Sequence, residues 1–376
     1  MTGSSRSAPV YGAGVMLLAM LWVGCDDGTG DSTTLAGTDS DGRTADSVDT
    51  TDTADTADTA DSASPCAEVV FTATDGRQED LTDAFTEGDF VTLDQEGVLG
   101  FCPGTWFVRL TAAAPLTVLG LGATPEETVL SGGESGTVLT ARGAGVDVVV
   151  ENATLDRGAT EGVRNEQLAG GITCAEGASV RVVDAVLSNH YAYDGAAVFA
   201  MSGCVLDLEG VRLTANSAED DGGAVRVDTS SATLTDVRFE GGEARDCGGL
   251  FVHDSDVSIR GAAFADNSSR DSQGGALLHY YGTLQIEDAT FETNVANGVG
   301  GAVALFGDTF LDRVSFVGNV ADTGGGAIYL YPDHGTLTCT GCSFADNSPD
   351  DVGLEGGGSY DFGDGVDFSC DTDGCR

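Results

Sequence analysis

Acidic side chains are the most numerous groups in this chain that could do chemistry, and one cluster of them, Glu219-Asp220-Asp221, precedes a Gly-Gly pair. Two carboxylates at a defined separation can hydrolyse a glycosidic bond. The alternative is that these acidic residues lie at a turn and only keep it solvated. Because the spacing singles out no pair of carboxylates, we assign no catalytic residue, no metal ligand and no cofactor.

The four histidines are the next candidates, because imidazole is a common metal ligand. His253 and His279 each stand at the same distance after a Gly-Gly pair, so we expect them to occupy equivalent positions and to stack. A metal pair would need a further ligand, and no carboxylate is fixed beside them by spacing. We therefore expect the two imidazole rings to be polar members of a ladder of stacked side chains, without a metal ion.

Ten cysteines are present, and Cys25 stands apart because it follows an apolar run over residues 15–23. Disulfides persist in exported chains, so the remaining cysteines are expected to pair. The candidates are Cys66 with Cys102, Cys174 with Cys204, and a C-terminal group of Cys339, Cys342, Cys370 and Cys375. We expect this group to form two disulfides, with a zinc site as the alternative, and Cys247 is left over.

An aromatic column is the strongest candidate for binding. Tyr280, Phe306 and Tyr331 recur at a nearly constant interval, which predicts that they form an outward-facing ridge on successive turns of the chain. An exposed row of aromatic rings can stack on sugars or contact a protein partner. The alternative is that a loop or the C-terminal tail covers the ridge.

The elements that must position these residues are repeats. A Gly-Gly or Gly-Ala pair is followed by a small or apolar residue at positions 172, 197, 224, 250, 276, 302 and 327. A second motif, a Phe or Leu followed three residues later by Asn, runs in phase, as in Phe291 with Asn294. Short runs of alternating polarity, with no helical stripe, predict strands.

These patterns predict an all-β fold, a parallel β-solenoid of about nine or ten coils in which each coil contacts only its neighbours. We expect the phenylalanines at 239, 264, 291, 316 and 344 to form an aromatic ladder in the core, beside a ladder of asparagine amides. Phe251 and Leu277 are assigned to one inward column. Residues 79–85 are expected to form a short helix in a cap over the first coil.

The repeats resemble those of polymorphic outer-membrane proteins, which carry GGA[I/L/V] and FxxN motifs. Gly274-Gly275-Ala276-Leu277 and Phe291-Glu292-Thr293-Asn294 carry the resemblance, which covers about residues 145–348. It implies the right-handed parallel β-helix of bacterial envelope proteins and a place at the cell surface. It implies little about activity.

Three segments are predicted along the chain. Residues 1–25 resemble a bacterial lipoprotein signal, in which Cys25 would be lipidated; an ordinary secretory signal is the alternative. Residues 26–65 hold eleven acidic residues and almost no large apolar ones, so we expect a disordered Asp/Thr-rich linker. Residues 66–376 are expected to form the β-helix domain, with an N-terminal cap and a Cys-rich C-terminal end.

Composition limits the function. The chain has 61 acidic and 16 basic residues, a formal charge of −45, and no lysine, so we exclude nucleic-acid binding. We predict a non-catalytic protein of the cell envelope, lipid-anchored at the outer membrane, that is structural or adhesive and binds a glycan or a cell-surface protein. Its membrane contact would be the lipid anchor only. The alternative is a carbohydrate-active enzyme, a polysaccharide lyase or glycoside hydrolase of the β-helix fold.

Overall fold

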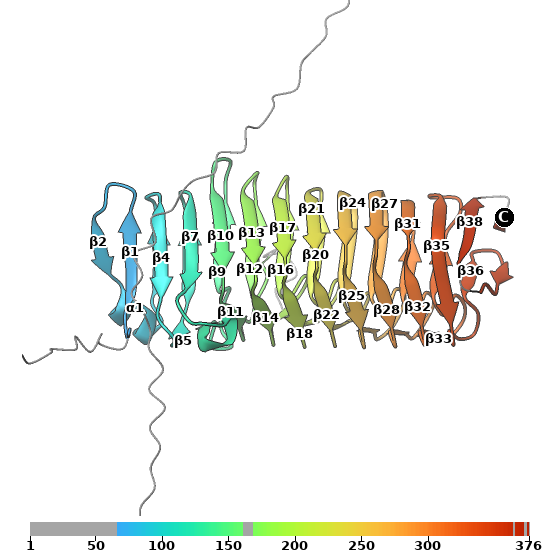
Figure 1. Ribbon diagram of the computed structural model, residues 1–376, viewed down its shortest axis with the longest axis horizontal. Coiled ribbons are helices and arrows are strands. Elements are labelled where there is room, and N and C mark those ends of the chain that lie inside the picture. Colours follow the sequence, from blue (N-terminus) through green and yellow to red (C-terminus); the bar gives the residue numbers. More distant parts are fainter. Residues whose placement is uncertain (1–65, 161–167, 364, 372–373, 376) are drawn as a thin grey trace, which may run out of the picture. The chain divides into compact units, whose positions relative to one another are not determined.

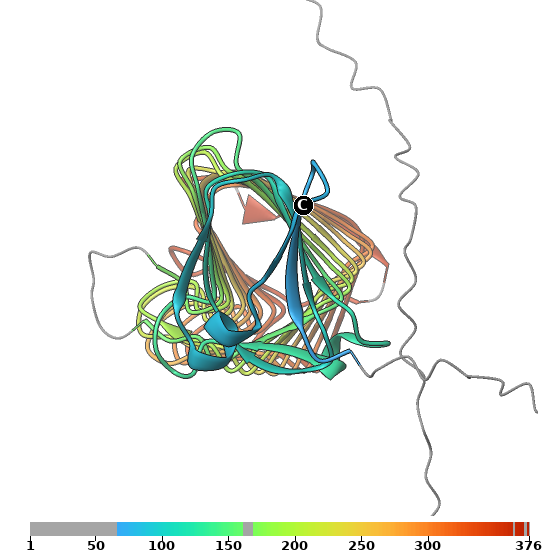
Figure 2. The same ribbon diagram turned by 90° about the vertical axis from the view of Figure 1, so that its left-hand side faces the viewer.

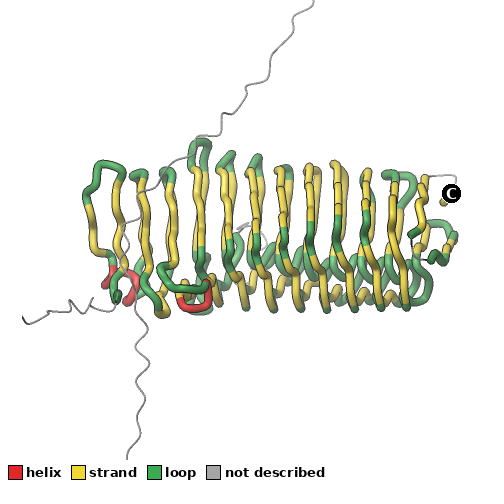
Figure 3. The backbone as a smooth tube through the Cα atoms, in the orientation of Figure 1, coloured by secondary structure: helices red, strands yellow, loops and turns green. Residues whose placement is uncertain are grey.

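A computed structural model describes residues 66–160, 168–363, 365–371 and 374–375. The expected signal segment, the acidic linker and Cys25 lie outside these residues. From Ala67 onward the chain forms one compact unit. Its coils are stacked along one axis (Figure 1), almost all of the regular structure is strand (Figure 3), and the coils superpose when viewed along the axis (Figure 2).

Each coil contributes strands to columns in which parallel strands pair from one coil to the next. The first column is β3 (Phe90–Leu93), β6 (Arg109–Ala112), β9 (Leu139–Arg142), β12 (Ile172–Ala175), β16 (Val198–Met201), β20 (Val225–Asp228), the first halves of β24 (Leu250–Arg260) and β27 (Leu277–Glu287), β30 (Val303–Leu305), β34 (Ile328–Leu330) and β36 (Val352–Leu354). The second column is β4 (Gly97–Phe101), β7 (Leu116–Gly120), β10 (Asp147–Glu151), β13 (Ser179–Val183), β17 (Val205–Glu209), β21 (Ser231–Thr235), the second halves of β24 and β27, β31 (Asp308–Asp312) and the start of β35 (Leu337–Ala345).

Two further columns complete the coil. The third is β5 (Gly104–Phe107), β8 (Thr128–Ser131), β11 (Thr154–Asp156), β14 (Val186–Ser188), β18 (Arg212–Thr214), β22 (Arg238–Glu240), β25 (Ala263–Ala265), β28 (Thr290–Glu292), β32 (Ser315–Val317) and the end of β35. The fourth is β15 (Tyr191–Ala192), β19 (Ser217–Ala218), β23 (Glu243–Ala244), β26 (Ser268–Ser269), β29 (Val295–Ala296) and β33 (Val320–Ala321). The predicted all-β parallel β-helix is confirmed, with about nine turns.

The predicted phenylalanine ladder lies in the core. Adjacent rings from Phe239 to Phe344 stack with centroids 4.4–5.2 Å apart. The rings follow the spacing of paired strands because each sits at the same register position in its coil. Burying a ring of this size on each coil of the ladder stabilises the stack in water.

The asparagine ladder runs beside it at the turn after the third column. Asn294 Nδ2 donates to Phe264 O (3.0 Å) in the preceding coil and to Asn319 Oδ1 (2.9 Å) in the following one. Asn319 Nδ2 in turn donates to Asn347 Oδ1 (3.0 Å). At the end of the ladder, Asn347 Nδ2 donates to Asp351 Oδ1 (3.1 Å).

The predicted inward column is wrong at one coil. Leu250, not Phe251, pairs in register with Leu277 and is buried in the core, and Phe251 points outward. The coil has one residue fewer after its Gly-Gly pair than the sequence pattern assumes. Cys247, with a φ of 62°, occupies the position that Gly274, also at 62°, fills in the next coil.

Both ends of the stack are closed by antiparallel elements. β1 (Val69–Ala73) pairs antiparallel with β2 (Gln78–Asp80) and β4, and α1 (Thr82–Glu87) buries Phe85 against Phe101 (centroids 5.1 Å apart). The expected helix therefore exists but begins three residues later than predicted. At the other end β37 (Ser359–Tyr360), β38 (Val366–Asp371) and β39 (Gly374–Cys375) pair antiparallel. Such closure prevents another strand from adding to the sheet.

Candidate functional site

The aromatic ridge Tyr280, Phe306 and Tyr331 lies outside the main core on successive coils of the first column, as its spacing predicts. The ring centroids are 4.1 Å apart for Tyr280 and Phe306 and 3.6 Å apart for Phe306 and Tyr331, with interplanar angles of 14°. The rings therefore stack on one another, and Phe306 is only 8% exposed. The ridge presents ring edges to its surroundings rather than free ring faces.

A second apolar cluster, which includes Phe306 of the ridge, lies outside the main core. It consists of Cys247, Phe251, Leu278, Ala304 and Phe306. A loop also reaches over the ridge, because Tyr331 Oη donates to Gln273 Oε1 (2.9 Å) and the His334 ring lies 5.8 Å from that of Phe306. The partial cover fits the alternative in which loops bury the ridge, although Tyr280 and Tyr331 remain half-buried.

Stacked ring faces change what the ridge can bind. A sugar stacks on the face of an aromatic ring, and in this column the faces contact each other. The ridge is therefore better suited to packing than to binding a sugar, and a partner would meet ring edges and the Tyr280 hydroxyl. Its spacing could be predicted from the sequence, but its stacking could not.

We expect the triple change Tyr280→Ser, Phe306→Ser and Tyr331→Ser to lower the free energy of unfolding by at least 3 kcal/mol, because loss of one buried Phe typically costs about 3–5 kcal/mol. Urea unfolding followed by circular dichroism measures it. Tyr281→Ser is the control, because this neighbouring ring is 41% exposed. An unchanged midpoint in the triple variant would show that the stack is not structural.

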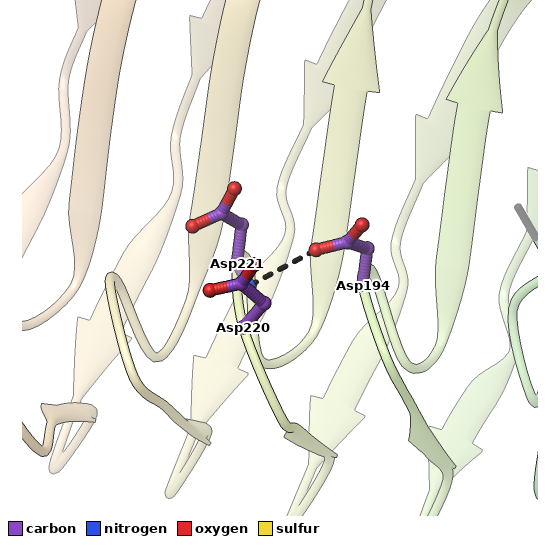
Figure 4. Close-up of side chains that lie close together, drawn as sticks. All are labelled: Asp194, Asp220 and Asp221. Atoms are coloured by element: carbon purple, nitrogen blue, oxygen red, sulfur yellow. Dashed lines mark hydrogen bonds between the residues drawn. The ribbon is translucent and has the colours of Figure 1, made fainter. Parts of the chain in front are cut away.

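An acidic cluster lies in the loops that lead into the first column. Asp194 precedes Gly195 before β16, and Asp220-Asp221 precede Gly222 before β20 (Figure 4). Ligand oxygens of the three carboxylates lie within 4.8 Å of one another, and Asp221 N donates to Asp194 Oδ1 (3.1 Å). Three convergent carboxylates are a donor set that a hard cation such as Ca²⁺ prefers.

Arg226 binds two of these carboxylates from β20. Its guanidinium forms ion pairs with Asp194 (2.9 Å) and Asp221 (2.7 Å). The guanidinium also lies between the rings of Phe199 and Phe251, at 5.4 and 4.9 Å from their centroids, because the three residues are register neighbours in the first column. This cation–π sandwich fixes the position of the charge.

A second arginine serves the remaining carboxylate. Arg245 forms ion pairs with Asp220 and with Asp246 (3.0 Å). Each of the three clustered carboxylates thus has an arginine partner, and a cation would have to compete with the two guanidinium groups for the same oxygens. The arrangement favours an internally neutralised network over a metal site.

Burial controls the protonation of this cluster. Desolvation, together with the neighbouring carboxylates of Asp194 and Asp220 and against the opposing charge of Arg226, raises the pKa of Asp221 to about 7. Desolvation also raises the pKa of Asp194. The cluster can therefore hold a proton near neutral pH.

Sequence reasoning singled out Asp220 and Asp221 but missed Asp194 and Arg226. The signal was the position of Asp194, which like Asp221 directly precedes a motif glycine.

The predicted stacking of His253 on His279 is wrong. His253 pairs in register with Tyr280 and points outward, with Nδ1 3.2 Å from Asp228 Oδ1. His279 pairs with Val252 and is buried, with Nδ1 3.0 Å from Thr309 Oγ1. The one-residue shift at Cys247 puts the two rings on opposite faces of the strand, so they cannot share a metal ion.

His190 is a residue whose role sequence reasoning missed. It stands three residues after Leu187, at the asparagine position of its coil, and is fully buried. Nε2 donates to Leu155 O (3.0 Å), Nδ1 accepts from Gly158 N (3.0 Å), and its own N–H donates to Asn216 Oδ1 (3.0 Å). Desolvation lowers the pKa of His190 to about 4, so the ring is neutral in the ladder at pH 7.

The cysteines are paired in the described part of the chain, apart from one. Disulfides join Cys174 to Cys204, Cys339 to Cys342, and Cys370 to Cys375. Cys66 and Cys102, which are predicted to pair, are both disulfide-bonded. The C-terminal sulfurs therefore form two disulfides rather than the alternative zinc site. Cys247 is a free thiol, buried in the second apolar cluster.

Comparison with known proteins gives one short match. Within the residues that the structure describes, no helix has the length and apolar character needed to cross a membrane. No curated protein and no solved structure matches the chain. Residues 313–331, which run from the turn before β32 to just after β34, match the model of the Chlamydia polymorphic membrane protein repeat. The chain is thus a β-helix repeat protein, and residues 313–331, which form part of one coil, are similar to the repeat of that family.

Proposed function

We propose that this protein is a lipid-anchored, non-catalytic protein of the cell surface, which holds a binding domain away from the outer membrane on an acidic linker. The observation that carries this proposal is the regularity of the coils. Register partners recur at a short and nearly constant interval along the chain, from Val198 through Val225, Leu250, Leu277 and Val303 to Ile328.

Regular coils add length to the stack and leave few residues for building a walled catalytic cleft. The carboxylates that would serve an enzyme, Asp220 and Asp221, are bound by Arg245 and Arg226 instead of being free to meet a substrate. A long stack with satisfied ladders suits display and contact. The match to a polymorphic membrane protein repeat supports a place at the cell surface.

The lipid anchor gives the first test. Cys25→Ser is expected to move the exported protein from the membrane fraction to the soluble fraction, because one side chain would carry the whole attachment. Immunoblots of fractionated cells measure the shift, and Cys247→Ser, which changes a thiol inside the domain, is the matched control. Protease added to intact cells should remove the anchored wild-type domain.

Two results would contradict this proposal. A wild-type protein already soluble after export would exclude the anchor. A membrane-bound protein that resists protease on intact cells, yet is cleaved after lysis, would place the domain inside the envelope rather than on the surface.

A further inference from the structure

An uncharged row of side chains crosses the outward face of the second column, in the C-terminal half of the stack. Direct register partners place its members one behind another on successive coils: Thr233, Ser258, Gln285, Phe310 and Thr338. Neighbouring members leave the sheet about 4.8 Å apart, which is the spacing of paired strands. Earlier in the same row, Arg181 and Asp207 carry charge, so the uncharged stretch begins at Thr233.

A hollow of about 390 Å³ lies over this row, on β24, β27, β31 and β35, which are neighbours in the stack (Figure 1). Phe310 lines the hollow and is 46% exposed. The rings of the ridge stack on one another, whereas Phe310 contacts no other aromatic ring within the described part of the chain. Its ring is therefore available for stacking on a ligand.

Uncharged polar side chains lie on both sides of this ring in the hollow. Ser258 and Gln285 precede Phe310 along the stack, and Thr338 and Thr340 follow it. Among the residues that the structure describes, none makes a hydrogen bond with these four side chains. Hydroxyl and amide groups can both donate and accept, so the hydroxyl groups of a ligand can take the place of solvent at all four.

The charged residues that line the hollow, Arg260, Glu287 and Asp312, are already in ion pairs. Arg260 is paired with Glu287, and the neighbouring Arg313 is paired with Glu287 (2.5 Å) and with Asp312. One guanidinium against two carboxylates on the lining leaves no surplus of positive charge for an acidic ligand. A cationic ligand would have to displace an arginine from its carboxylate. The hollow therefore favours a neutral ligand.

We propose that this hollow binds a neutral, extended glycan, with one sugar ring stacked on Phe310 and neighbouring sugar hydroxyls bonded to Gln285 and Thr338. An aromatic ring offers a flat apolar surface, and a sugar ring has an apolar face with hydroxyl groups around its rim. Because the row is straight, it suits a straight glycan chain. A protein interface has several aromatic and apolar residues at its centre, whereas Phe310 is the one aromatic residue on this lining. This inference rests on the proposed role as a surface-binding protein, and it names the site and the class of ligand.

The exported full-length protein should be titrated by calorimetry with hexasaccharides that differ in shape and charge. Cellohexaose and N-acetylated chitohexaose are neutral and extended, maltohexaose is neutral and curved, and the hexamers of galacturonate and of glucosamine are acidic and cationic. We expect an extended neutral sugar to bind about tenfold or more tightly than the other three. Its affinity should be the same at about 0.05 and about 0.5 M salt, because screening does not affect uncharged contacts.

Two substitutions test the contacts. Phe310→Ala should weaken the binding about tenfold, by analogy with the loss of an aromatic ring that stacks on a base, and Phe310→Trp should retain it. Gln285→Ala should weaken it about threefold, as expected for the loss of neutral hydrogen bonds. Phe107→Ala is the matched control, since Phe107 is 47% exposed on β5 of the third column and lies outside the hollow. It should leave the affinity unchanged.

Equal weakening by Phe310→Ala and Phe107→Ala would overturn the site, as would the absence of binding to both extended neutral sugars. Equal binding of maltohexaose would overturn the match to a straight chain, and tighter binding of either charged hexamer would overturn the neutral ligand. A protein that is anchored and exposed on cells but binds neither extended sugar would overturn only this inference. A protein that binds one of them but is soluble after export would overturn the anchored surface role and leave this site in place.

Discussion

Replacing Phe291 by Ala is expected to lower the free energy of unfolding by about 3–5 kcal/mol, as for other buried Phe truncations. Phe291 is fully buried, and its ring stacks on Phe264 at 4.6 Å and on Phe316 at 5.0 Å. The change removes both stacking contacts and leaves a cavity between three coils. Urea unfolding monitored by far-ultraviolet circular dichroism gives the value.

Phe310→Ala provides the same chemical change at the surface, because Phe310 is 46% exposed on β31. It should cost less than about 1 kcal/mol, since little apolar area returns to water. Comparable losses for Phe291→Ala and Phe310→Ala would show that the ladder adds nothing beyond ordinary packing.

The second large effect is a dependence of stability on pH. The pKa of His190 is lowered by burial from 6.5 to about 4 in the folded protein. Below pH 6.5 the unfolded chain therefore binds a proton that the folded chain refuses, and stability falls as the pH drops towards 4. The loss accumulates at about 1.4 kcal/mol per pH unit, or about 3 kcal/mol in all.

His190→Asn should remove this loss. An asparagine can occupy the same ladder position without titrating, so the variant should match the wild type near pH 7 and exceed its stability by about 3 kcal/mol near pH 4. The comparison isolates one residue, because His279, whose burial also lowers its pKa to about 4, is unchanged in both proteins. Asp221 acts in the opposite sense and is also common to both.

Asn216→His is the converse change, one coil further along the ladder, and should add acid sensitivity of the same sign. Urea unfolding at half-unit steps between pH 4 and 7.5 measures all three proteins. Parallel curves for the wild type and His190→Asn would mean that the imidazole of His190 is not the acid-sensitive group.

The sequence could predict those parts of the fold that repeat. Phe316 and Asn319 fall at a fixed interval and a fixed separation, and the coils on either side repeat the same two side chains at the same corner. The third-column register follows from that spacing alone. His190 is harder to recognise, because it occupies the asparagine position of its coil without being an asparagine. Its ring makes the hydrogen bonds of the ladder with imidazole nitrogens instead of an amide.

Other features depend on contacts that no spacing records. Whether Leu250 or Phe251 faces the core depends on a cysteine adopting the positive φ of a glycine, as Cys247 does. The network around Arg226 depends on the position of Asp194 in the loop before β16, where its carboxylate meets an arginine of the following coil. The spacing of the ridge residues predicts that they form a column. Whether the faces of their rings are free or stacked on one another depends on side-chain rotamers, which the spacing does not record.

The asparagine ladder gives the stack an electrical direction. From Asn267 to Asn319, each amide Nδ2 donates to a Phe carbonyl of the preceding coil and also to the amide oxygen of the next ladder Asn, so the amide-to-amide hydrogen bonds all run towards the C-terminal end of the stack. The positive end of this row is at Asn347, and there the carboxylate of Asp351 accepts the last N–H. Asp351 therefore caps the ladder in the way that an acidic N-cap residue caps a helix, by accepting an N–H group that would otherwise have no partner in the row. A coil inserted within the row would preserve this match of dipole and charge, whereas one added beyond Asn347 would need a carboxylate of its own.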